Sequence, residues 1–273
     1  MERQTVVVTG STRGIGYGLA AEFLKLGHNV VVTGRSREAV DRALAGLRSP
    51  EAVLGQVCDV RSFESSQALW DAAVARFGRV DLWINNAAVA TDHLLFAELP
   101  PEQIAATIDT NLAGTMFGTR VALAGMLRQG GGRIYTFEGF GSNDMTSPGL
   151  AVYGATKRAI RYLTAAVAKE CRGTPVLVGA LSPGMVPTDL LLYSSRGNDP
   201  EQWARARRMM NILADRVETV TPWLAQQALA NQKQGATIEW LTRSKALRRF
   251  LMAPFVRRDL MSELESRDSV VVR

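Results

Sequence analysis

The sequence predicts an α/β protein with a doubly wound parallel sheet. Short apolar runs, of the kind that form buried strands, alternate along the chain with stretches that repeat apolar residues at helical spacing. A glycine-rich turn directly follows the first apolar run, at the place where such sheets bind ligands. The chain has 273 residues, of which 47% are hydrophobic, which is enough for one large core. We therefore expect a single domain over residues 1–273.

The first predicted strand covers residues 5–9 and contains three valines in a row. A helix with apolar residues at helical spacing follows the glycine-rich turn and ends at Gly27. Strand, glycine-rich turn and helix in this order indicate a dinucleotide site, because the glycines let the backbone approach a pyrophosphate at the helix N-terminus. An ordinary tight turn is the alternative interpretation. The candidate cofactor-binding residues of the turn are Gly10, Ser11, Thr12, Arg13, Gly14, Ile15 and Gly16.

The end of the second predicted strand, at residues 30–33, bears on the choice of cofactor. An NAD site usually places an acidic residue there to bind the ribose 2′-hydroxyl, whereas this chain continues with Gly34, Arg35 and Ser36. A basic residue at this position, together with Arg13 in the turn, suits a 2′-phosphate. We therefore predict NADP(H) rather than NAD(H), with Arg35 and Ser36 among the binding residues. A plain surface role for Arg35 is the alternative.

Strands and helices continue to alternate through the next fifty residues. Helices are expected at Arg37–Leu47 and Phe63–Phe77, and strands at Val53–Val57 and at 80–84. This alternation is why we expect parallel strands with helices on both faces.

Tyr153 and Lys157 stand four residues apart, a spacing that places both side chains on one face of a helix. An ammonium group beside a phenol favours the phenolate and lowers the phenol's pKa. Such a tyrosine can protonate a carbonyl oxygen while hydride arrives at the carbon. The pair by itself is a weak signal, and it gains weight from the dinucleotide site that precedes it.

Taken together, these features resemble the short-chain dehydrogenase/reductase family over about the first 190 residues. The resemblance implies a Rossmann fold, usually assembled as a homodimer or homotetramer, and a small-molecule carbonyl substrate. The motifs that carry it are Thr9-Gly10-x-x-x-Gly14-Ile15-Gly16, Asp59-Val60, Asn85-Asn86-Ala87-Ala88, Asn111, Tyr153-x-x-x-Lys157 and Ser182-Pro183-Gly184.

The resemblance also implies a role for each matching residue. Tyr153 is the proton donor, Lys157 binds the nicotinamide ribose and tunes Tyr153, and Asn111 holds a water in the proton relay. Tyr153 and Lys157 thus belong to the cofactor site as well. The further cofactor-binding residues that the resemblance implies are Asp59 and Val60 at the adenine, Asn86 and Ala87 along the adenosine ribose, and Pro183, Gly184, Val186 and Thr188 at the carboxamide.

One position departs from the family pattern. The family usually has a serine after its fifth strand that holds the substrate carbonyl, and this chain has Gly139 at that position. Ser142 is the nearest hydroxyl downstream. It is either a replacement for the missing catalytic serine or an ordinary loop residue, and both interpretations stay open.

The sequence around Gly139 resembles the chlorophyll b reductase branch of the family, which has an acid-Gly-x-Gly-Ser stretch at this place. In this chain the stretch runs from Glu138 to Ser142, and a Ser-Pro-Gly-Met-Val segment begins at Ser182. This resemblance implies NADPH-dependent reduction of the 7-formyl group of chlorophyll b, a tetrapyrrole pigment. A general carbonyl or 3-oxoacyl reductase or alcohol dehydrogenase is the first alternative. A non-catalytic NADP-sensing scaffold is the second.

Two segments lie on the substrate side of the expected fold. Residues 190–231 form a long apolar excursion that we expect to be a substrate lid. Residues 243–273 form a C-terminal extension, and residues 243–258 within it combine basic and apolar residues at helical spacing. This segment either contacts a membrane surface or packs its apolar face on the domain or on a sister subunit. Pro254 argues against one continuous helix.

Cysteine content, charge and the start of the first strand indicate the cellular compartment and the classes of ligand and partner to expect. The two cysteines, Cys58 and Cys171, show no metal-binding spacing and no disulfide framework, so we expect a reducing cytoplasm, with or without peripheral membrane contact, and no metal. We expect no signal peptide, because the first predicted strand starts within a few residues of Met1. The net charge of +6 raises nucleic acid as a partner, but no binding module is recognisable and we expect none.

Overall fold

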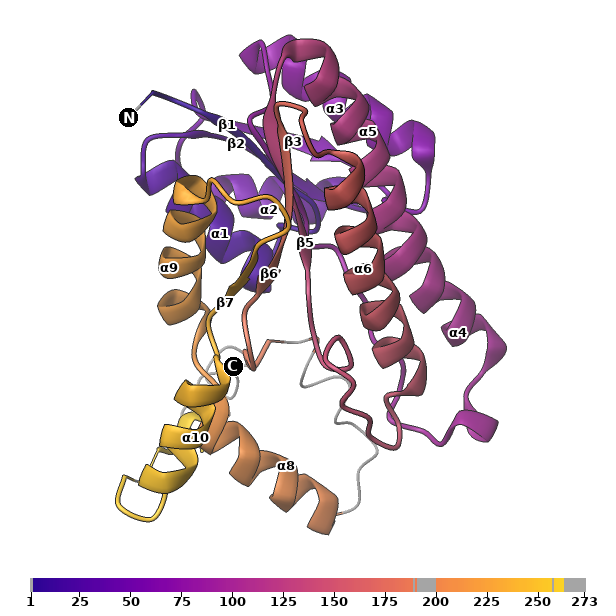
Figure 1. Ribbon diagram of the computed structural model, residues 1–273, viewed down its shortest axis with the longest axis vertical. Coiled ribbons are helices and arrows are strands. Elements are labelled where there is room, and N and C mark those ends of the chain that lie inside the picture. The colour runs from indigo at the N-terminus through magenta and orange to yellow at the C-terminus, as the bar shows by residue number, and fades with distance from the viewer. Residues whose placement is uncertain (1, 189, 191–199, 257, 263–273) are drawn as a thin grey trace.

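A computed structural model describes residues 2–188, 190, 200–256 and 258–262. Its centre is a sheet of seven parallel strands in the order β3-β2-β1-β4-β5-β6-β7 (Figure 1). The strands are β1 (Thr5–Val8), β2 (Asn29–Gly34), β3 (Val53–Val57), β4 (Leu82–Asn85), β5 (Gly132–Phe137), β6 (Val176–Ser182) and β7 (Thr237–Glu239). The strand order reverses between β1 and β4, so the predicted doubly wound sheet is confirmed.

Helices cover both faces of this sheet. The helical segments are α1 (Gly14–Lys25), α2 (Arg37–Leu47), α3 (Phe63–Phe77), η1 (Phe96–Glu98), α4 (Pro101–Thr107), η2 (Ile108–Ala113), α5 (Gly114–Gln129), α6 (Ala151–Glu170), α8 (Pro200–Leu213), α9 (Val217–Ala230) and α10 (Arg243–Met252). Buried residues of α1, α2 and α9 pack with Val6 and Val8 of β1 on one face. Residues of α3, α5 and α6 pack with Val7 on the other, because successive strand side chains point to opposite faces.

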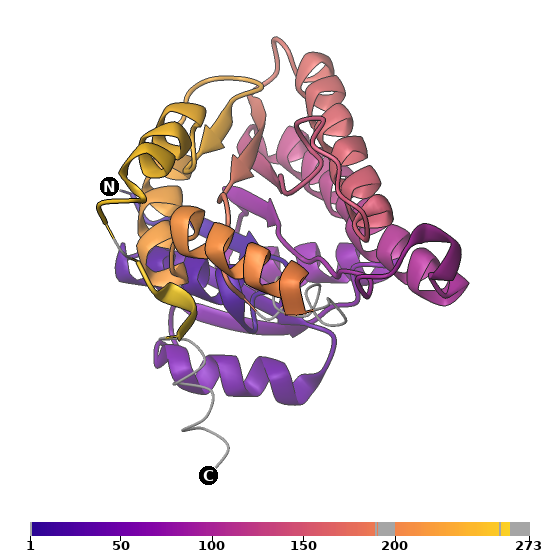
Figure 2. The ribbon, with the colours of Figure 1, turned by 90° about the horizontal axis from the view of Figure 1, so that it is seen from below.

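The range predicted as a substrate lid divides into parts with different roles. Residues 191–199 lie outside the described residues. Helix α9, at the end of the range, is part of the core, since Val220, Leu224 and Ala228 are fully buried against α1. The lid assignment is therefore wrong for α9. Helix α8 lies beyond the carboxyl ends of the strands, as the view from below shows (Figure 2).

The C-terminal extension is fastened to the end of α8. Asp215 is buried, and its carboxylate accepts hydrogen bonds of 2.7 and 2.9 Å from Arg249, 2.9 Å from Arg258 and 2.7 Å from Trp240. The same two arginines donate to the last carbonyl oxygens of α8, Arg249 to that of Leu213 and Arg258 to those of residues 212 and 214. Cationic side chains at a helix C-terminus satisfy carbonyl groups that have no intrahelical partner.

Helix α10 itself buries none of its residues. Leu247, Leu251 and Phe255 are 62, 66 and 81% exposed, so the expectation that the apolar face of this segment packs on its own domain is wrong. The helix ends at Met252, two residues before Pro254, in agreement with the predicted break. Among the described residues, no helix is both long and apolar enough to cross a bilayer.

Candidate active site

The glycine-rich turn packs directly on the chain that follows β4. Gly10 has a φ of +63°, and a Cβ built on it would come within 2.8 Å of the Cα of Ala87. A Cβ on Gly16 would come within 2.5 Å of Nδ2 of Asn86. Both positions therefore require glycine, and the predicted residues 10–16 and 86–87 are brought together at the carboxyl end of β1.

Hydrogen bonds hold this junction. Nδ2 of Asn86 donates to the carbonyl oxygens of Thr9 (2.9 Å) and Gly10 (3.1 Å). In return, the Thr9 hydroxyl accepts from the backbone N–H groups of Asn86 (3.0 Å) and Ala87 (3.1 Å). The role of Thr9 was missed from the sequence, although a hydroxyl at the end of the first strand is the signal that could have indicated it.

The turn also meets the segment after β6. A Cβ on Gly14 would lie 3.4 Å from Cγ2 of Thr188, so these two predicted cofactor residues are neighbours. Gly184 has a φ of +71° and packs against Leu241, while Val186 belongs to the core on the α1 side. The structure thus brings the predicted pyrophosphate and carboxamide segments to one edge of the sheet.

Other predicted cofactor residues have structural partners. The buried Ser11 hydroxyl donates to Val8 O (2.6 Å) and accepts from Thr33 N (2.9 Å). The Ser36 hydroxyl caps α2 by accepting from Ala39 N (3.3 Å). These bonds fix the ends of β1 and β2 relative to the turn.

The predicted adenine end carries several charges. Arg61 donates to both carboxylate oxygens of Asp59, and this pairing lowers the pKa of Asp59, with Arg35 adding a smaller effect of the same sign. Arg13 and Arg35 are exposed, and Val60 is buried next to Gly114.

Tyr153 and Lys157 lie in the first two turns of α6, as predicted. The Lys157 ammonium is buried, donates to the Phe137 carbonyl oxygen (3.1 Å) and lies 5.6 Å from the centroid of the Tyr153 ring. Burial lowers the pKa of Lys157 to about 8, opposed by the negative charge of Glu138. Burial raises the pKa of Tyr153 to about 12. The prediction of a lowered Tyr153 pKa is therefore wrong for the protein alone, because the loss of hydration dominates.

Asn111 lies in η2, a π-helical segment between α4 and α5, and is buried. Its side chain accepts from Val89 N (2.8 Å) and donates to Val89 O (2.9 Å) and to the Thr156 hydroxyl (3.3 Å). Thr156 in turn donates to the Tyr153 carbonyl oxygen (2.7 Å). Asn111 therefore links the loop after β4 to the helix that carries Tyr153. Its predicted water-binding role stays a prediction.

Gly139 lies beside the Tyr153 hydroxyl. A Cβ on Gly139 would come within 2.8 Å of the Tyr153 oxygen and 3.3 Å of Cε of Lys157. The buried Ser142 hydroxyl accepts from Gly139 N (3.1 Å) and is directed at Lys157 O (3.3 Å). A hydroxyl has one proton to donate, so Ser142 would have to give up the Lys157 bond to donate to a substrate carbonyl. Its position favours a role in holding the loop.

Two arginines of α6 that the sequence analysis did not single out complete this arrangement. Arg158 (3.0 Å) and Arg161 (3.3 Å) both donate to the Ser142 carbonyl oxygen. Arg161 also lies 3.7 Å from the buried carboxylate of Glu138, whose pKa is raised by burial. Arg161 follows Lys157 by four residues on the same helix face, which is the signal that could have indicated it.

The Lys157 site predicts a pH-dependent stability difference. Below pH 8 the folded protein must bury this ammonium as a cation, whereas in the unfolded chain the ammonium is hydrated and stays charged up to about pH 10.5. We expect Lys157→Met to raise the free energy of unfolding at pH 7 by up to about 3 kcal/mol, since each pKa unit corresponds to about 1.4 kcal/mol. The gain should shrink as the pH rises from 8 toward 10.5, where the wild-type lysine is neutral in the folded state.

Urea unfolding of both proteins at pH 7 and pH 9.5 measures this difference. Lys169→Met, at an exposed lysine of the same helix, is the matched control. A difference that does not change with pH would contradict the interpretation.

Several curated proteins are similar to this chain over most of its length. Chlorophyll(ide) b reductase NOL of Oryza sativa subsp. japonica is 39% identical over 256 residues, covering 89% of this chain and 73% of the relative. NOL of Arabidopsis thaliana is 37% identical, covering 88% and 71%. Probable chlorophyll(ide) b reductase NYC1 of Arabidopsis thaliana is 35% identical, covering 89% of this chain, which spans only 52% of that relative. The resemblance to the chlorophyll b reductase branch is confirmed.

These names correct the prediction of a cytoplasmic location. The NOL and NYC1 proteins of both plants are named chloroplastic. The prediction relied on cysteine usage and on the early start of the first strand, and neither observation distinguishes the cytoplasm from a reducing organelle.

Solved structures and a family model agree with the fold. Serine dehydrogenase complexed with NADP⁺ is 26% identical with a TM-score of 0.77, covering 88% of this chain and 96% of that one. 3-Ketoacyl-(acyl-carrier-protein) reductase from Brucella melitensis, complexed with NADH, has a TM-score of 0.79 at 23% identity, covering 89% and 99%, and supports the fold alone. The model of the short chain dehydrogenase family matches residues 4–198. The chain belongs to the short-chain dehydrogenase family.

Proposed function

We propose that this protein is an NADPH-dependent reductase of the 7-formyl group of chlorophyll b or chlorophyllide b. One observation carries the proposal. The family model ends at residue 198, whereas the similarity to the rice chlorophyll(ide) b reductase covers 89% of the chain and so extends into the segments that follow β6. The family resemblance implies that the stretch between β6 and α9 lies beside the substrate, so similarity there bears on what is bound.

The glycine-rich turn fits a dinucleotide. Gly10 and Gly14 adopt positive φ angles of +63° and +58°, and the N-cap residue of α1, Arg13, does not cap the helix with a side-chain hydrogen bond. The first turn of that helix would present its N–H groups to a pyrophosphate. Residues 10–16 and 86–87 would hold the cofactor, with Arg13 and Arg35 at the 2′-phosphate. The carboxamide would lie along residues 183–188.

A reduced nicotinamide supplies the hydride when bound. The high pKa of Tyr153 keeps its phenol protonated at neutral pH, so its Oη can donate a proton to the carbonyl oxygen as the carbon is reduced. The Lys157 ammonium stabilises the negative charge left on the phenolate. Asn111 and Thr156 orient the first turns of α6.

Gly139 makes room at the phenol. Because no Cβ is present there, the formyl group of a large ring system can approach the Tyr153 hydroxyl without contacting a side chain on the loop. Ser142, Arg158 and Arg161 hold the loop in place.

We also propose assembly as a homodimer or homotetramer, on the basis of the family resemblance. The exposed apolar residues of α10 support a further proposal, membrane contact through residues 243–258.

The central test uses Tyr153→Phe. Loss of the proton donor should reduce NADPH-dependent reduction of chlorophyllide b by about 100-fold or more, with NADPH affinity kept. Pigment absorbance, with identification of the hydroxymethyl product, measures the reaction. Tyr162→Phe is the matched control, since Tyr162 lies on the same helix and is 78% exposed.

A Tyr153→Phe protein that still turns over would contradict the assignment. If the wild type reduces 3-oxoacyl esters or small ketones but no formyl pigment, the substrate proposal is wrong and the general reductase replaces it. If the wild type binds NADPH but reduces none of these substrates, the protein is a non-catalytic NADP-sensing scaffold and the proposed activity is wrong.

Gly139→Ala tests the space at the phenol. The new Cβ would lie within 2.8 Å of the Tyr153 oxygen, so the hydroxyl must shift. We expect kcat to fall by about tenfold or more while Tm changes little, because the displaced atom is the end of a side chain; one misplaced hydrogen bond accounts for a loss of this size. Steady-state kinetics and thermal unfolding check both parts, and an unchanged kcat would show that the space is not needed.

Arg35→Ser tests the choice of cofactor. Loss of a charged hydrogen bond to the 2′-phosphate should raise the KM for NADPH by about tenfold or more and leave the KM for NADH nearly unchanged. Arg37→Ser, at an exposed arginine of α2, is the control. Equal effects on both cofactors would contradict NADP specificity.

A further inference from the structure

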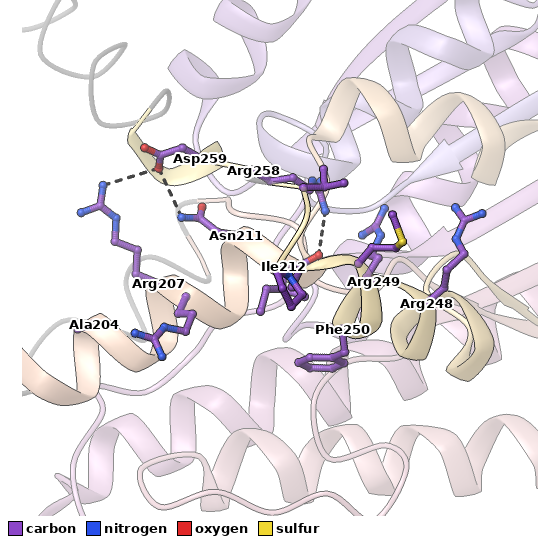
Figure 3. Close-up of a pocket in the computed structure, with 14 residues that line it drawn as sticks. Ala204, Arg207, Asn211, Ile212, Arg248, Arg249, Phe250, Arg258 and Asp259 are labelled. Atoms are coloured by element: carbon purple, nitrogen blue, oxygen red, sulfur yellow. Dashed lines mark hydrogen bonds and ion pairs between the residues drawn. The ribbon is translucent and has the colours of Figure 1, made fainter.

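A groove of about 1210 Å³ lies between α8 and α10, outside the residues assigned to the catalytic reaction (Figure 3). The chain after α10 closes one side of it. Its arginines come from three segments and are Arg207, Arg208, Arg248, Arg249 and Arg258. Its volume is slightly larger than that of typical small-molecule sites, which measure about 300–1,000 Å³.

Three of the five arginines hold the walls of the groove together. Arg249 and Arg258 bind Asp215 and the end of α8, as described above. Arg207 donates to the Ser262 hydroxyl (2.6 Å) and lies 4.0 Å from Asp259. Asp259, the acidic residue in the lining, also accepts from Asn211 (3.4 Å), as the dashed lines of Figure 3 indicate.

The other two arginines have no such partner. Within the described part of the chain, neither Arg208 nor Arg248 makes a hydrogen bond or an ion pair, and both are exposed. The positive charge of the groove affects a neighbouring group. Burial lowers the pKa of Lys245, Asp215 opposes this effect, and the three arginines at 248, 249 and 258 lower the pKa further. An anion with two or more acceptor oxygens, such as a carboxylate, is the ligand class that two guanidinium groups recognise.

Apolar side chains also line the groove. Phe250, Met252 and Val256 line it and are 42, 46 and 49% exposed. Exposed apolar side chains grouped in a concave site indicate a ligand with an apolar body. The ligand class is therefore an apolar molecule that carries a carboxylate.

The groove borders the substrate side of the site. Met210 and Ala214 of the α8 segment pack with Met185, which lies between the predicted carboxamide residues Gly184 and Val186. The backbone N–H of Asp215 donates to the Met185 carbonyl oxygen (3.0 Å). The end of α8 and the two residues that follow it thus connect the groove wall to the expected cofactor site.

We propose that the α8–α10 groove, through Arg208 and Arg248, binds the free carboxylate of the pigment substrate and so favours chlorophyllide over esterified chlorophyll. This inference rests on the proposed function and deepens it. The occupant is the substrate rather than a lipid, because a volume of this size beside the predicted substrate segments exceeds what a headgroup needs.

The test measures binding without turnover. Chlorophyllide a lacks the formyl group, so it reports binding to the full-length protein independently of the reaction. We expect it to bind with an affinity about tenfold or more higher than its methyl ester, in which the carboxylate is neutralised. Arg208→Gln/Arg248→Gln should lower the affinity for the free acid by about the same factor and remove the discrimination, with NADPH affinity unchanged. Arg128→Gln, at an exposed arginine of α5, is the control.

Equal binding of acid and ester by the wild type, no binding of chlorophyllide a, or an unaffected double variant would overturn the inference. A second arm uses phosphatidylglycerol vesicles against phosphatidylcholine vesicles. If the double variant loses only vesicle binding, the groove is a lipid site and the inference is wrong. If the wild type binds chlorophyllide a more tightly than its methyl ester but does not reduce chlorophyllide b, the groove still recognises the carboxylate. The proposed function is then wrong.

Discussion

Every part of the candidate site depends on the parallel arrangement of the sheet, which brings all seven carboxyl strand ends to one edge. The ends of β1 and β4 are closely packed at this edge. There Asn86 donates to two carbonyl oxygens of the neighbouring strand end, and Gly10 and Gly16 leave no space for a Cβ. Because this contact fixes the glycine-rich turn against residues 86–87, it also sets the position of the helix N-terminus that would receive a pyrophosphate.

Tyr153 and Lys157, the predicted catalytic pair, show how burial sets the protonation of a candidate site at a cost in stability. Lys157 is buried with a carbonyl oxygen as its hydrogen-bond acceptor and Glu138 as a nearby anion, and its pKa still falls to about 8. The loss of hydration therefore outweighs the attraction between the charges. The same effect keeps Tyr153 protonated, which suits a proton donor. Ser142, Arg158 and Arg161 hold the neighbouring loop, so the space at Gly139 is maintained by contacts between this loop and α6.

The C-terminal extension uses its positive charge in two ways. Arg249 and Arg258 are internal, since they bind the buried Asp215 and cap α8. Arg248 instead lines the groove, together with Arg208 of α8, and within the described residues it makes no hydrogen bond or ion pair. A run of basic residues that looks uniform in the sequence thus contains structural members that position the groove and others that can act in it. The balance of exposed apolar and cationic groups there distinguishes this segment from an ordinary solvated helix.

The sequence by itself determined the sheet, its winding and the main motifs, because strand and helix periodicities and glycine positions are local properties of the chain. The predicted bounds of α2, β3 and α3 agree with the structure. Only the tertiary structure placed α9 in the core, raised the pKa of Tyr153 and directed the Ser142 hydroxyl at Lys157 O. It also separated Arg249 and Arg258 from Arg208 and Arg248. These outcomes depend on which groups are buried together across distant segments, and burial and long-range pairing are not encoded in any local pattern.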